Sequence, residues 1–550
     1  MKIIKQISSL EKVRCDDILN YPEIHKKSVL RGERFSYQIA ARVQGHIQGK
    51  LEVVSPLLPH IRVFSVLNAV MDAPVTDIAA DEPYKDIDYI TKEPGLMPDI
   101  LEPIEVKNNM WMVWKNSASI WIEVNIPRDA LPGEYHIDIR LLHKDTNEEI
   151  FSKKMTLEIA DKEVLPQSLI YTRWFHADCI ADYHGVEVYS EEHWKLIEAY
   201  IHEAADVGIN MILIPVHTPP LDTAIGSART CVQLVDIKKE NDKYTFTFDK
   251  FKRFVAICKR CGIKYYEIAH MFSQWGAKAA PNIMVEENGV SSYMFGWDTK
   301  SDSEEYVSFL KQYIAAISQA LEDEGISDKT YFHISDEPKL DNIDSYKRAS
   351  DLIKPLIGSS KTLDALSEYA FYEKGLVECP VTCVDHISEF LKHDIPNQWT
   401  YYCVGPQRRY TNSFMAMPSR RVRILGLLLY KYDIKGFLHW GLNFYNAPLS
   451  RYPINPYVTT SAEGCYPSGD SFILYPVKDG ACNSIRGKVT YEAIGDMNLC
   501  RTLEQYIGRD AVVKMIDDEA GMDVSFEEYP KDNYYILNLR DKMIEKLKQI

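Results

Sequence analysis

Short alternations of apolar and polar residues recur through the first 165 positions, and this period of two is typical of half-buried β-strands. The clearest runs are residues 36–43, 119–124, 135–141 and 154–159. A turn containing Pro and Gly at 127–133 separates two of them. Short strands joined by turns favour two sheets packed face to face. We therefore predict an N-terminal β-sandwich domain over residues 1–165.

From about residue 167 the rhythm changes to strand, loop and helix, repeated along the chain. The expected strands are 169–176, 210–216, 263–270, 331–337, 362–367, 381–385, 399–404 and 435–440. Helical patterns follow several of them, and the first helix, 190–207, has Ser190 as its N-cap. Eight such units predict a TIM-like (β/α)8 barrel over residues 166–508.

The last segment, residues 509–550, is predicted to be a short α/β tail. Residues 534–539 are expected to form a strand and 540–548 a helix. The predicted fold class is thus multidomain, with an all-β sandwich, an α/β barrel and this C-terminal tail.

The fourth expected strand ends in two adjacent carboxylates, Asp336 and Glu337, and is stopped by Pro338. Within a regular strand these neighbours point to opposite faces. Both can face one ligand only where the pleat ends, and a proline there removes a ladder donor. Reactive groups of such barrels lie at the carboxyl ends of the strands. The pair is therefore a candidate catalytic centre, although a helix-capping role is the alternative for an isolated acid pair.

Aromatic, histidine or carboxylate side chains follow six of the eight expected strands. They include Trp174, His176, Asp222, Trp275, Glu337, Tyr401 and Trp440. Each one alone has an alternative interpretation as barrel filling or loop structure. Together they indicate an aromatic-walled pocket around one acid pair. Such a pocket suits a sugar ring, which needs flat stacking faces and directional hydrogen bonds.

Composition and charge narrow the possible partners. The 550 residues are 46% hydrophobic and 26% charged, as in a folded soluble protein, and the net charge of -16 argues against nucleic acid or an anionic membrane. No apolar run reaches membrane-spanning length and no signal peptide is recognisable, so we expect a cytoplasmic protein. Eleven scattered cysteines fit reduced thiols better than a disulfide framework.

Other catalytic chemistries lack a motif in this sequence. It contains no Walker or GxGxxG loop and no GxSxG elbow. His176, Asp178, Asp222 and His270 lie near strand ends, but no HxH or HExxH spacing favours a metal site. We therefore expect neither a metal nor a cofactor.

Six ordered blocks of the sequence resemble glycoside hydrolase family 123. They are residues 174–178, 218–223, 272–276, 333–338, 437–443 and 468–476. The resemblance spans about residues 170–490 and does not cover the tail. The family comprises β-N-acetylgalactosaminidases with a β-sandwich followed by a (β/α)8 barrel, so the resemblance implies a carbohydrate substrate that ends in β-linked N-acetylgalactosamine.

The resemblance also implies substrate-assisted retention, in which the acetamide oxygen of the sugar attacks the anomeric carbon and forms an oxazolinium ion. Glu337 would then be the general acid and later the base, and Asp336 would orient the acetamide. The adjacency of the two residues fits this chemistry. Ordinary retaining enzymes place two carboxylates about 5 Å apart on opposite sides of the bond, and substrate-assisted enzymes are exceptions.

The remaining site predictions concern the pocket walls. Trp275 and Trp440 are expected to stack on the sugar ring, with Trp174 as a further substrate-binding residue. Tyr401 is expected to bind the acetamide carbonyl. The residues expected to bind sugar hydroxyls are His176, Asp222, Gln274 and Asn443.

Three alternatives stay open. A conventional two-carboxylate glycosidase would use Glu267, Asp364 or Asp385 as its nucleophile. The spacing of residues does not separate N-acetylgalactosamine from N-acetylglucosamine. A non-catalytic carbohydrate-binding protein on an inactivated barrel is the alternative from another class, and the intact acid pair argues against it.

Overall fold

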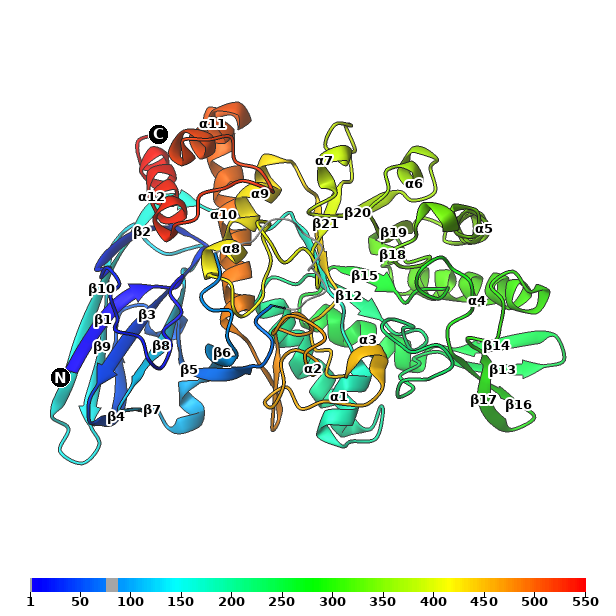
Figure 1. The fold of residues 1–550 in the computed structure, drawn as a ribbon, viewed down its shortest axis with the longest axis horizontal. Coiled ribbons are helices and arrows are strands. Elements are labelled where there is room, and N and C mark those ends of the chain that lie inside the picture. The colour runs from blue at the N-terminus through cyan, green and yellow to red at the C-terminus, as the bar shows by residue number, and fades with distance from the viewer. Residues whose placement is uncertain (1, 76–87) are drawn as a thin grey trace.

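Two five-stranded sheets form the N-terminal part of the computed structural model, which describes residues 2–75 and 88–550 (Figure 1). The first sheet has the order β1 (Lys2–Ser8), β3 (Arg34–Val43), β8 (Ser117–Asn125), β5 (Ile61–Met71) and β6 (Gly95–Pro103). The second has the order β2 (Lys26–Arg31), β10 (Glu149–Glu163), β9 (Gly133–His143), β4 (His46–Val54) and β7 (Met110–Trp114). The four runs predicted as strands lie in β3, β8, β9 and β10.

One hydrophobic cluster takes side chains from both sheets. Ile39 and Ile120 of the first sheet and Ile139 and Leu157 of the second are fully buried in it. In β9 and β10 of the second sheet the buried residues recur at every second position, so one face of this sheet turns to the shared core. In β3 and β8 of the first sheet consecutive residues are buried, so both faces of that sheet are covered.

The middle of the chain forms a closed barrel of eight parallel strands. In order around the barrel they are β11 (Ile170–Arg173), β12 (Met211–Ile214), β15 (Tyr265–Ile268), β18 (Thr330–Phe332), β19 (Lys361–Leu366), β20 (Cys379–Cys383), β21 (Trp399–Tyr401) and β22 (Gly436–His439). Each of the eight expected strands overlaps one of them, but the observed strands are shorter than predicted or displaced at their ends.

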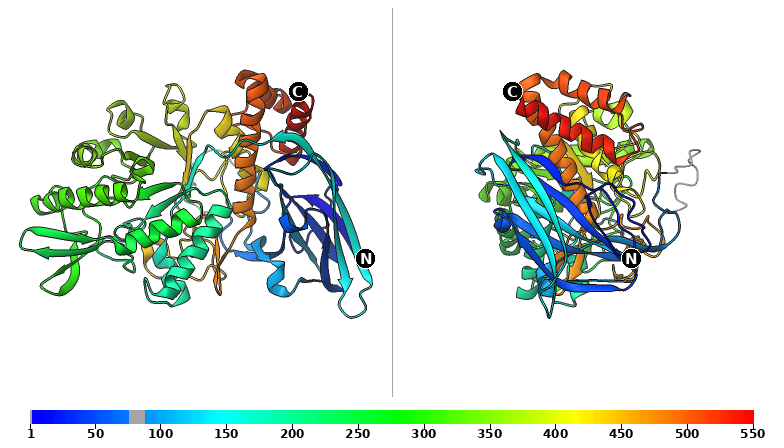
Figure 2. Two further views of the ribbon diagram at one scale, coloured as in Figure 1. Left: turned by 180° about the vertical axis from the view of Figure 1, so that it is seen from behind. Right: turned by 90° about the vertical axis from the view of Figure 1, so that its left-hand side faces the viewer.

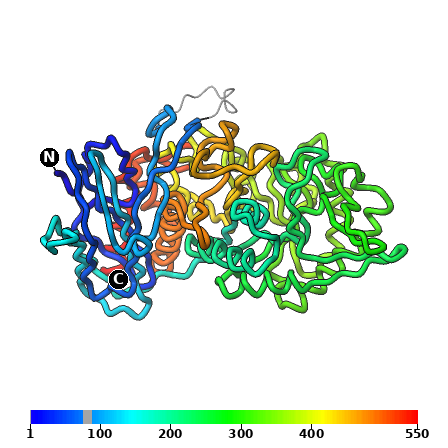
Figure 3. Tube along the Cα trace, turned by 90° about the horizontal axis from the view of Figure 1, so that it is seen from below, coloured from blue at the N-terminus to red at the C-terminus, as the bar shows by residue number. Residues whose placement is uncertain are grey.

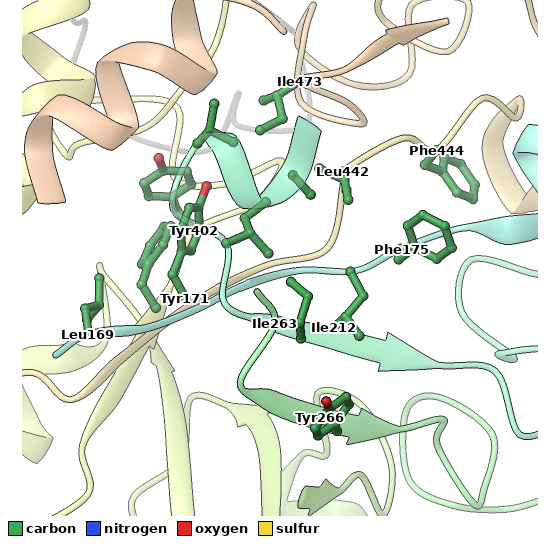
Figure 4. Packing of buried hydrophobic residues seen from close by; sticks show 14 of the residues in the cluster. Leu169, Tyr171, Phe175, Ile212, Ile263, Tyr266, Tyr402, Leu442, Phe444 and Ile473 are labelled. Carbon is green, nitrogen blue, oxygen red and sulfur yellow. The ribbon is translucent and has the colours of Figure 1, made fainter. Parts of the chain in front are cut away.

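The helices that follow barrel strands are α1 (Ala177–His184), α2 (Glu191–Asp206), α3 (Asp249–Arg260), α4 (Glu304–Asp323), α5 (Ile343–Ile353), α6 (Ala370–Glu373), α7 (Ile387–Phe390), α8 (Ser419–Arg423), α9 (Leu425–Lys431) and α10 (Ile485–Ile507). Ser190 caps α2, as predicted, because its side chain accepts a hydrogen bond from the amide of His193. Figure 4 shows apolar side chains that fill the space between strands and helices, among them Tyr171, Ile212 and Tyr402.

Two small sheets extend the loops of the barrel. The larger has the order β14 (Lys243–Thr247), β13 (Asp236–Glu240), β16 (Ile283–Glu287) and β17 (Val290–Phe295). The smaller pairs β23 (Tyr475–Val477) with β24 (Gly480–Cys482). Strands β13 and β14 form an antiparallel hairpin in the long insertion after the second barrel strand.

The fourth barrel strand is shorter than the sequence indicates. It was expected to continue to Glu337, but β18 ends at Phe332. Beyond this point the backbone amides of Ile334 and Ser335 donate to the carboxylate of Asp364 on the next strand. A side chain thus takes the donors that a continued ladder would use, and the acid pair lies in a loop.

The predicted strand at 534–539 is wrong, because these residues begin a helix, α12 (Asn533–Lys548), which follows α11 (Arg509–Ala520). Asp532 caps α12 by accepting hydrogen bonds from the amides of Tyr534 and Tyr535. The buried side chains of the helix recur every three or four residues. The tail is therefore helical, and α12 packs against β2, β10 and α10.

Helix α10 stands between the sheets and the barrel, as seen from both sides of the molecule (Figures 1 and 2). The molecule is elongated along the line from the N-terminal sheets to the barrel. Both chain termini lie at the end formed by the N-terminal sheets (Figure 3). No helix among residues 2–75 and 88–550 is long and apolar enough to cross a membrane.

Candidate active site

A cleft with an empty volume of about 630 Å³ opens where the carboxyl ends of the barrel strands meet. Loops after most of the barrel strands contribute to it. Its lining residues are Trp174, Leu221, Asp222, Gln274, Asp336, Glu337, Ala365, Tyr401, Cys403, Val404, Leu438, Trp440 and Tyr466. The acid pair, the third carboxylate Asp222 and four large aromatic residues with polar groups therefore line one cleft.

Asp336 is almost fully buried, with 7% of its surface exposed. Its Oδ2 accepts a hydrogen bond of 3.0 Å from Nε2 of Gln274. Burial and the neighbouring charge of Glu337 raise the pKa of Asp336 to about 8, against the lowering effects of Gln274 and His333. In the ligand-free protein this carboxyl group therefore carries a proton at neutral pH.

Glu337 has a left-handed backbone conformation, with φ of 43°. This conformation lets two neighbouring residues direct their side chains into one cleft, which a regular strand forbids. The amide of Glu337 donates to Ala365 O on the next strand, and the Tyr401 hydroxyl donates to its Oε1 over 2.7 Å. The backbone and the carboxylate of Glu337 are thus both fixed by hydrogen bonds.

A short chain of hydrogen bonds fixes the orientation of Gln274. Its Oε1 accepts from the amide of Asp222 at 2.9 Å, so its Nε2 is the atom that faces Asp336. The carboxylate of Asp222 accepts in turn from the hydroxyl of Tyr466 at 2.8 Å and from the amide of Leu449 at 3.1 Å. Burial raises the pKa of Asp222.

Two tryptophans of the cleft are held by buried carboxylates. Nε1 of Trp440 donates to Asp470 over 2.9 Å, and Nε1 of Trp174 donates to Glu267 over 3.0 Å. The ring of Tyr466 meets Trp440 edge-on at 5.3 Å. Burial raises the pKa of Asp470 to about 7, whereas the hydrogen bond from Trp440 lowers it. The indole rings therefore have fixed orientations before any ligand binds.

Of the eight residues predicted to bind substrate, five line the cleft: Trp174, Asp222, Gln274, Tyr401 and Trp440. Trp275 is outside the lining. Its side chain is 49% exposed beside the cleft, and its amide donates to Asp336 O at 2.9 Å.

His176 and Asn443 also lie outside the lining of the cleft, and they bind each other. Asn443 accepts from the amide of His176 and donates to its carbonyl, at 3.0 and 2.9 Å. The ring of His176 contacts Trp440 O and the guanidinium of Arg229. Burial and then the charge of Arg229 lower the pKa of His176 to about 3, so its ring is neutral. The two residues tie the loops after the first and last barrel strands together.

Several lining residues were not singled out in the sequence, and Tyr466 is the most informative. It lies in the long loop between β22 and β23, where no periodicity indicates which side chains turn inward. Its position just before the sequence block at 468–476 is the signal that could have identified it.

The spare carboxylates considered for a conventional mechanism lie outside the cleft lining. Glu267 and Asp364 are fully buried on either side of His333, with contacts of 2.7 and 3.3 Å to its two ring nitrogens. Asp385, two residues after β20, binds Nδ1 of His386 over 2.7 Å. Each of these three carboxylates therefore already contacts a histidine ring nitrogen.

Two groups of residues bring potential metal ligands together in the described part of the chain: His270, His333 and Asp364, and Cys383, Asp385 and His386. In the first group the two imidazole rings stack 4.2 Å apart at an angle of 16°, so their in-plane lone pairs do not converge on one ion. In the second group Asp385 already accepts from His386.

The chain was then compared with known proteins. The catalytic-domain model of glycoside hydrolase family 123 matches residues 174–503, which is more than half of the chain. Comparison with curated protein sequences gives no match. A family 123 glycoside hydrolase from Clostridium perfringens, solved in a study of glycolipid glycan hydrolysis, has a similar structure with a TM-score of 0.72 and 15% identity. The alignment covers 100% of this chain and 97% of that one.

Other solved glycosidases are more distant. β-Glucuronidase 2 from Bacteroides uniformis aligns with a TM-score of 0.31 and 8% identity, covering 92% of this chain and 50% of that one. The family model spans every strand of the barrel after β11 and the whole acid-pair loop. On this match, with the Clostridium structure in agreement over the whole length, the chain belongs to glycoside hydrolase family 123.

Proposed function

We propose that this glycosidase releases terminal β-linked N-acetylgalactosamine from glycans or glycolipids by substrate-assisted catalysis. The observation that carries the proposal is the arrangement of carboxylates. Asp336 and Glu337 are neighbours on one loop, and the spare acids Glu267 and Asp364 are enclosed with His333 outside the cleft. A sugar in the cleft therefore meets both catalytic acids from one side, as the acetamide mechanism requires.

In the first step of this mechanism Glu337 donates a proton to the glycosidic oxygen. The acetamide oxygen attacks the anomeric carbon as the bond to the leaving group breaks, which yields an oxazolinium ion and the free aglycone. In the second step Glu337 takes a proton from water, and the water oxygen attacks the anomeric carbon. The oxazolinium ring opens, which releases the N-acetylhexosamine with its original anomeric configuration. Glu337 is then protonated again.

Asp336 accepts a hydrogen bond from the acetamide N–H in this mechanism. That donor favours ionised Asp336, while the free protein holds a proton there. Substrate binding would therefore move the single proton of the pair toward Glu337, where acid catalysis needs it.

Tyr401 takes a different role from the one expected from the sequence. Its hydroxyl already donates to Oε1 of Glu337, so that proton is not free for the acetamide carbonyl. We assign Tyr401 to stabilising the Glu337 carboxylate after it has protonated the leaving group. Trp440 and Trp174, with indole N–H groups bound to carboxylates, are the proposed stacking walls.

The choice of N-acetylgalactosamine rests on membership of the family together with the relative from Clostridium perfringens, which acts on glycolipid glycans. The experiment is a screen of nitrophenyl β-glycosides that differ only at C2 or C4. We expect turnover of the N-acetylgalactosaminide, weaker turnover of the N-acetylglucosaminide and none of the galactoside. Equal rates on the galactoside, which lacks the acetamide, would show that the acetamide takes no part in catalysis.

The substitution Glu337→Gln tests the role of Glu337 as the general acid. It should lower kcat/KM by at least about a hundredfold on substrates with poor leaving groups and by less on nitrophenyl substrates, which need little protonation. Asp385→Asn, outside the cleft, is the control. Unchanged activity of Glu337→Gln on a disaccharide substrate would remove Glu337 from the acid role. Labelling of Asp222 by a 2-fluoro sugar would favour the conventional mechanism instead.

A further inference from the structure

A charged cluster lies fully buried in the barrel next to the acid pair. His333 contacts Glu267 through Nε2 at 2.7 Å and Asp364 through Nδ1 at 3.3 Å, and all three residues are fully buried. Ionised carboxylates only accept hydrogen bonds, so a ring that binds one on each side donates from both nitrogens. An imidazole with two N–H groups is an imidazolium, and the geometry therefore indicates a buried positive charge.

The cluster is connected to the cleft at two points. Glu267 accepts the indole N–H of Trp174, which lines the cleft. Asp364 accepts the backbone amides of Ile334 and Ser335, the two residues immediately before Asp336. Glu267 and Asp364 thus hold a cleft wall and the catalytic loop, and His333 is the cation between them.

We propose, building on the function proposed above, that His333 is a positioning residue whose positive charge holds Glu267 and Asp364 in place and sets the charge state of Asp336. It touches neither the cleft nor a substrate bound there. It acts through the carboxylates on either side and through its field on the acid pair, only three residues further along the chain.

The groups around His333 fit this role. The ring of His270 stacks on it, and the ring of Trp174 meets it at an angle of 87°, with 5.7 Å between the ring centroids. Burial, with the charges of His333 and His217, lowers the pKa of His270 far below its usual value, so His270 is neutral. The hydroxyls of Thr172 and Tyr346 donate to Glu267 and Asp364. Burial raises the pKa of Asp364, whereas the hydrogen bond and charge of His333 and the hydroxyl of Tyr346 lower it.

The pH range of this charge follows from the same contacts. Burial lowers the pKa of His333, but Asp364 and Glu267 outweigh it and raise the pKa to about 9. The stabilisation from the cation is therefore complete below the ordinary pKa of about 6.5 and is lost as the pH rises through about 9. The positive charge favours ionised Asp336, so its removal would make the acid pair hold its proton more tightly.

The first test observes the charge without any substrate. In protein labelled with 13C at histidine Cε1, NMR should show one buried histidine that is an imidazolium from pH 6 to pH 8 and titrates near pH 9. His333→Gln should remove this signal, and Glu267→Gln should lower its titration pH. A neutral His333 at pH 7 would overturn the proposal, and this result is independent of which glycoside the enzyme cleaves.

The second test separates charge from structure. His333→Gln keeps a hydrogen-bonding side chain but removes the cation, so both limbs of the pH profile of kcat/KM should move up by about one pH unit. His270→Gln is the matched control, because it removes an equally buried but neutral imidazole. Both limbs of the pH profile of His270→Gln should stay in place even if its kcat/KM falls. A lower rate with unmoved limbs in His333→Gln would reduce His333 to a packing residue.

Discussion

Asp336 and Glu337 differ in the hydrogen-bond partners that the fold gives them. Asp336 is buried with one neutral donor, Gln274, whereas Glu337 is held by the hydroxyl of Tyr401 and by a backbone bond to the neighbouring strand. The left-handed conformation of Glu337 costs about 1–3 kcal/mol and persists only where the surroundings impose it. The left-handed backbone thus lowers the stability of the fold while it directs two neighbouring acids into one cleft.

This arrangement predicts that Asp336→Asn stabilises the protein in alkaline solution. The pKa of Asp336 is about 8 in the folded state and about 4 in an unfolded chain. The folded wild type therefore loses stability as the pH rises from about 4 to about 8, and the asparagine variant has no such loss. At pH 9 the variant should be more stable by about 2 kcal/mol or more in urea unfolding, and the difference should vanish near pH 4. A difference that stays constant from pH 5 to pH 9 would contradict the assigned pKa.

At the scale of elements, α9 and α10 are in unusually close contact. A Cβ added at Gly426 of α9 would lie 1.8 Å from the carbonyl oxygen of Ala493 in α10, whereas one added at Gly495 of α10 would meet nothing within 4 Å. The barrel helix α9 can therefore approach α10 only through a glycine. This contact connects the barrel to the helix that separates it from the N-terminal sheets.

Gly426→Ala and Gly495→Ala form a matched pair of substitutions. Gly426→Ala should destabilise the protein by about 3 kcal/mol, because backbone must move to admit the methyl group. Gly495→Ala should be neutral or stabilise by up to about 1 kcal/mol, since alanine is the better helix former. Thermal unfolding of both variants checks this prediction. Equal effects would mean that the helices can separate without cost.

The sequence predicts elements better than it predicts their ends. Periodicity identified four of the ten strands that the structure describes in the N-terminal sheets, and all eight barrel strands. Strand β18 ends early because the side chain of Asp364 takes the amides that follow it. The predicted strand at 534–539 is a helix, because the four consecutive aromatic or aliphatic residues at 534–537 fit both periods. For the site, the sequence predicted the acid pair and most of the cleft walls. It could not reveal that His176 and Asn443 bind each other across two loops.

At the scale of the whole molecule, buried ion pairs join the N-terminal sheets to the C-terminal helices. Arg486 of α10 and Asp99 of β6 are both fully buried and 2.9 Å apart. Asp99 also accepts from the hydroxyl of Tyr475 at 2.7 Å, and Arg486 binds the carbonyl of Phe472 at 2.9 Å. The loop that follows β22 and contributes Tyr466 to the cleft is thus tied to the N-terminal sheets.

Asp99→Asn should accordingly affect the whole molecule. It leaves the guanidinium of Arg486 buried without an anion, which should destabilise the fold by about 3–5 kcal/mol. Asp351→Asn, which breaks the exposed pair between Lys347 and Asp351, should change stability by less than about 0.5 kcal/mol. Urea unfolding compares the two. Equal stability of both variants would show that the junction contributes little to the fold.

The central claim is that the substrate supplies its own nucleophile to a pair of acids on one loop. It is tested most directly by nitrophenyl β-N-acetylgalactosaminides with zero, one, two or three fluorine atoms on the acetamide methyl group. Fluorine withdraws electrons from the acetamide oxygen and weakens it as a nucleophile. We predict that kcat/KM falls steeply with each added fluorine, while the steric change stays small. A rate that does not depend on fluorine substitution would contradict the account and point to a nucleophile on the enzyme.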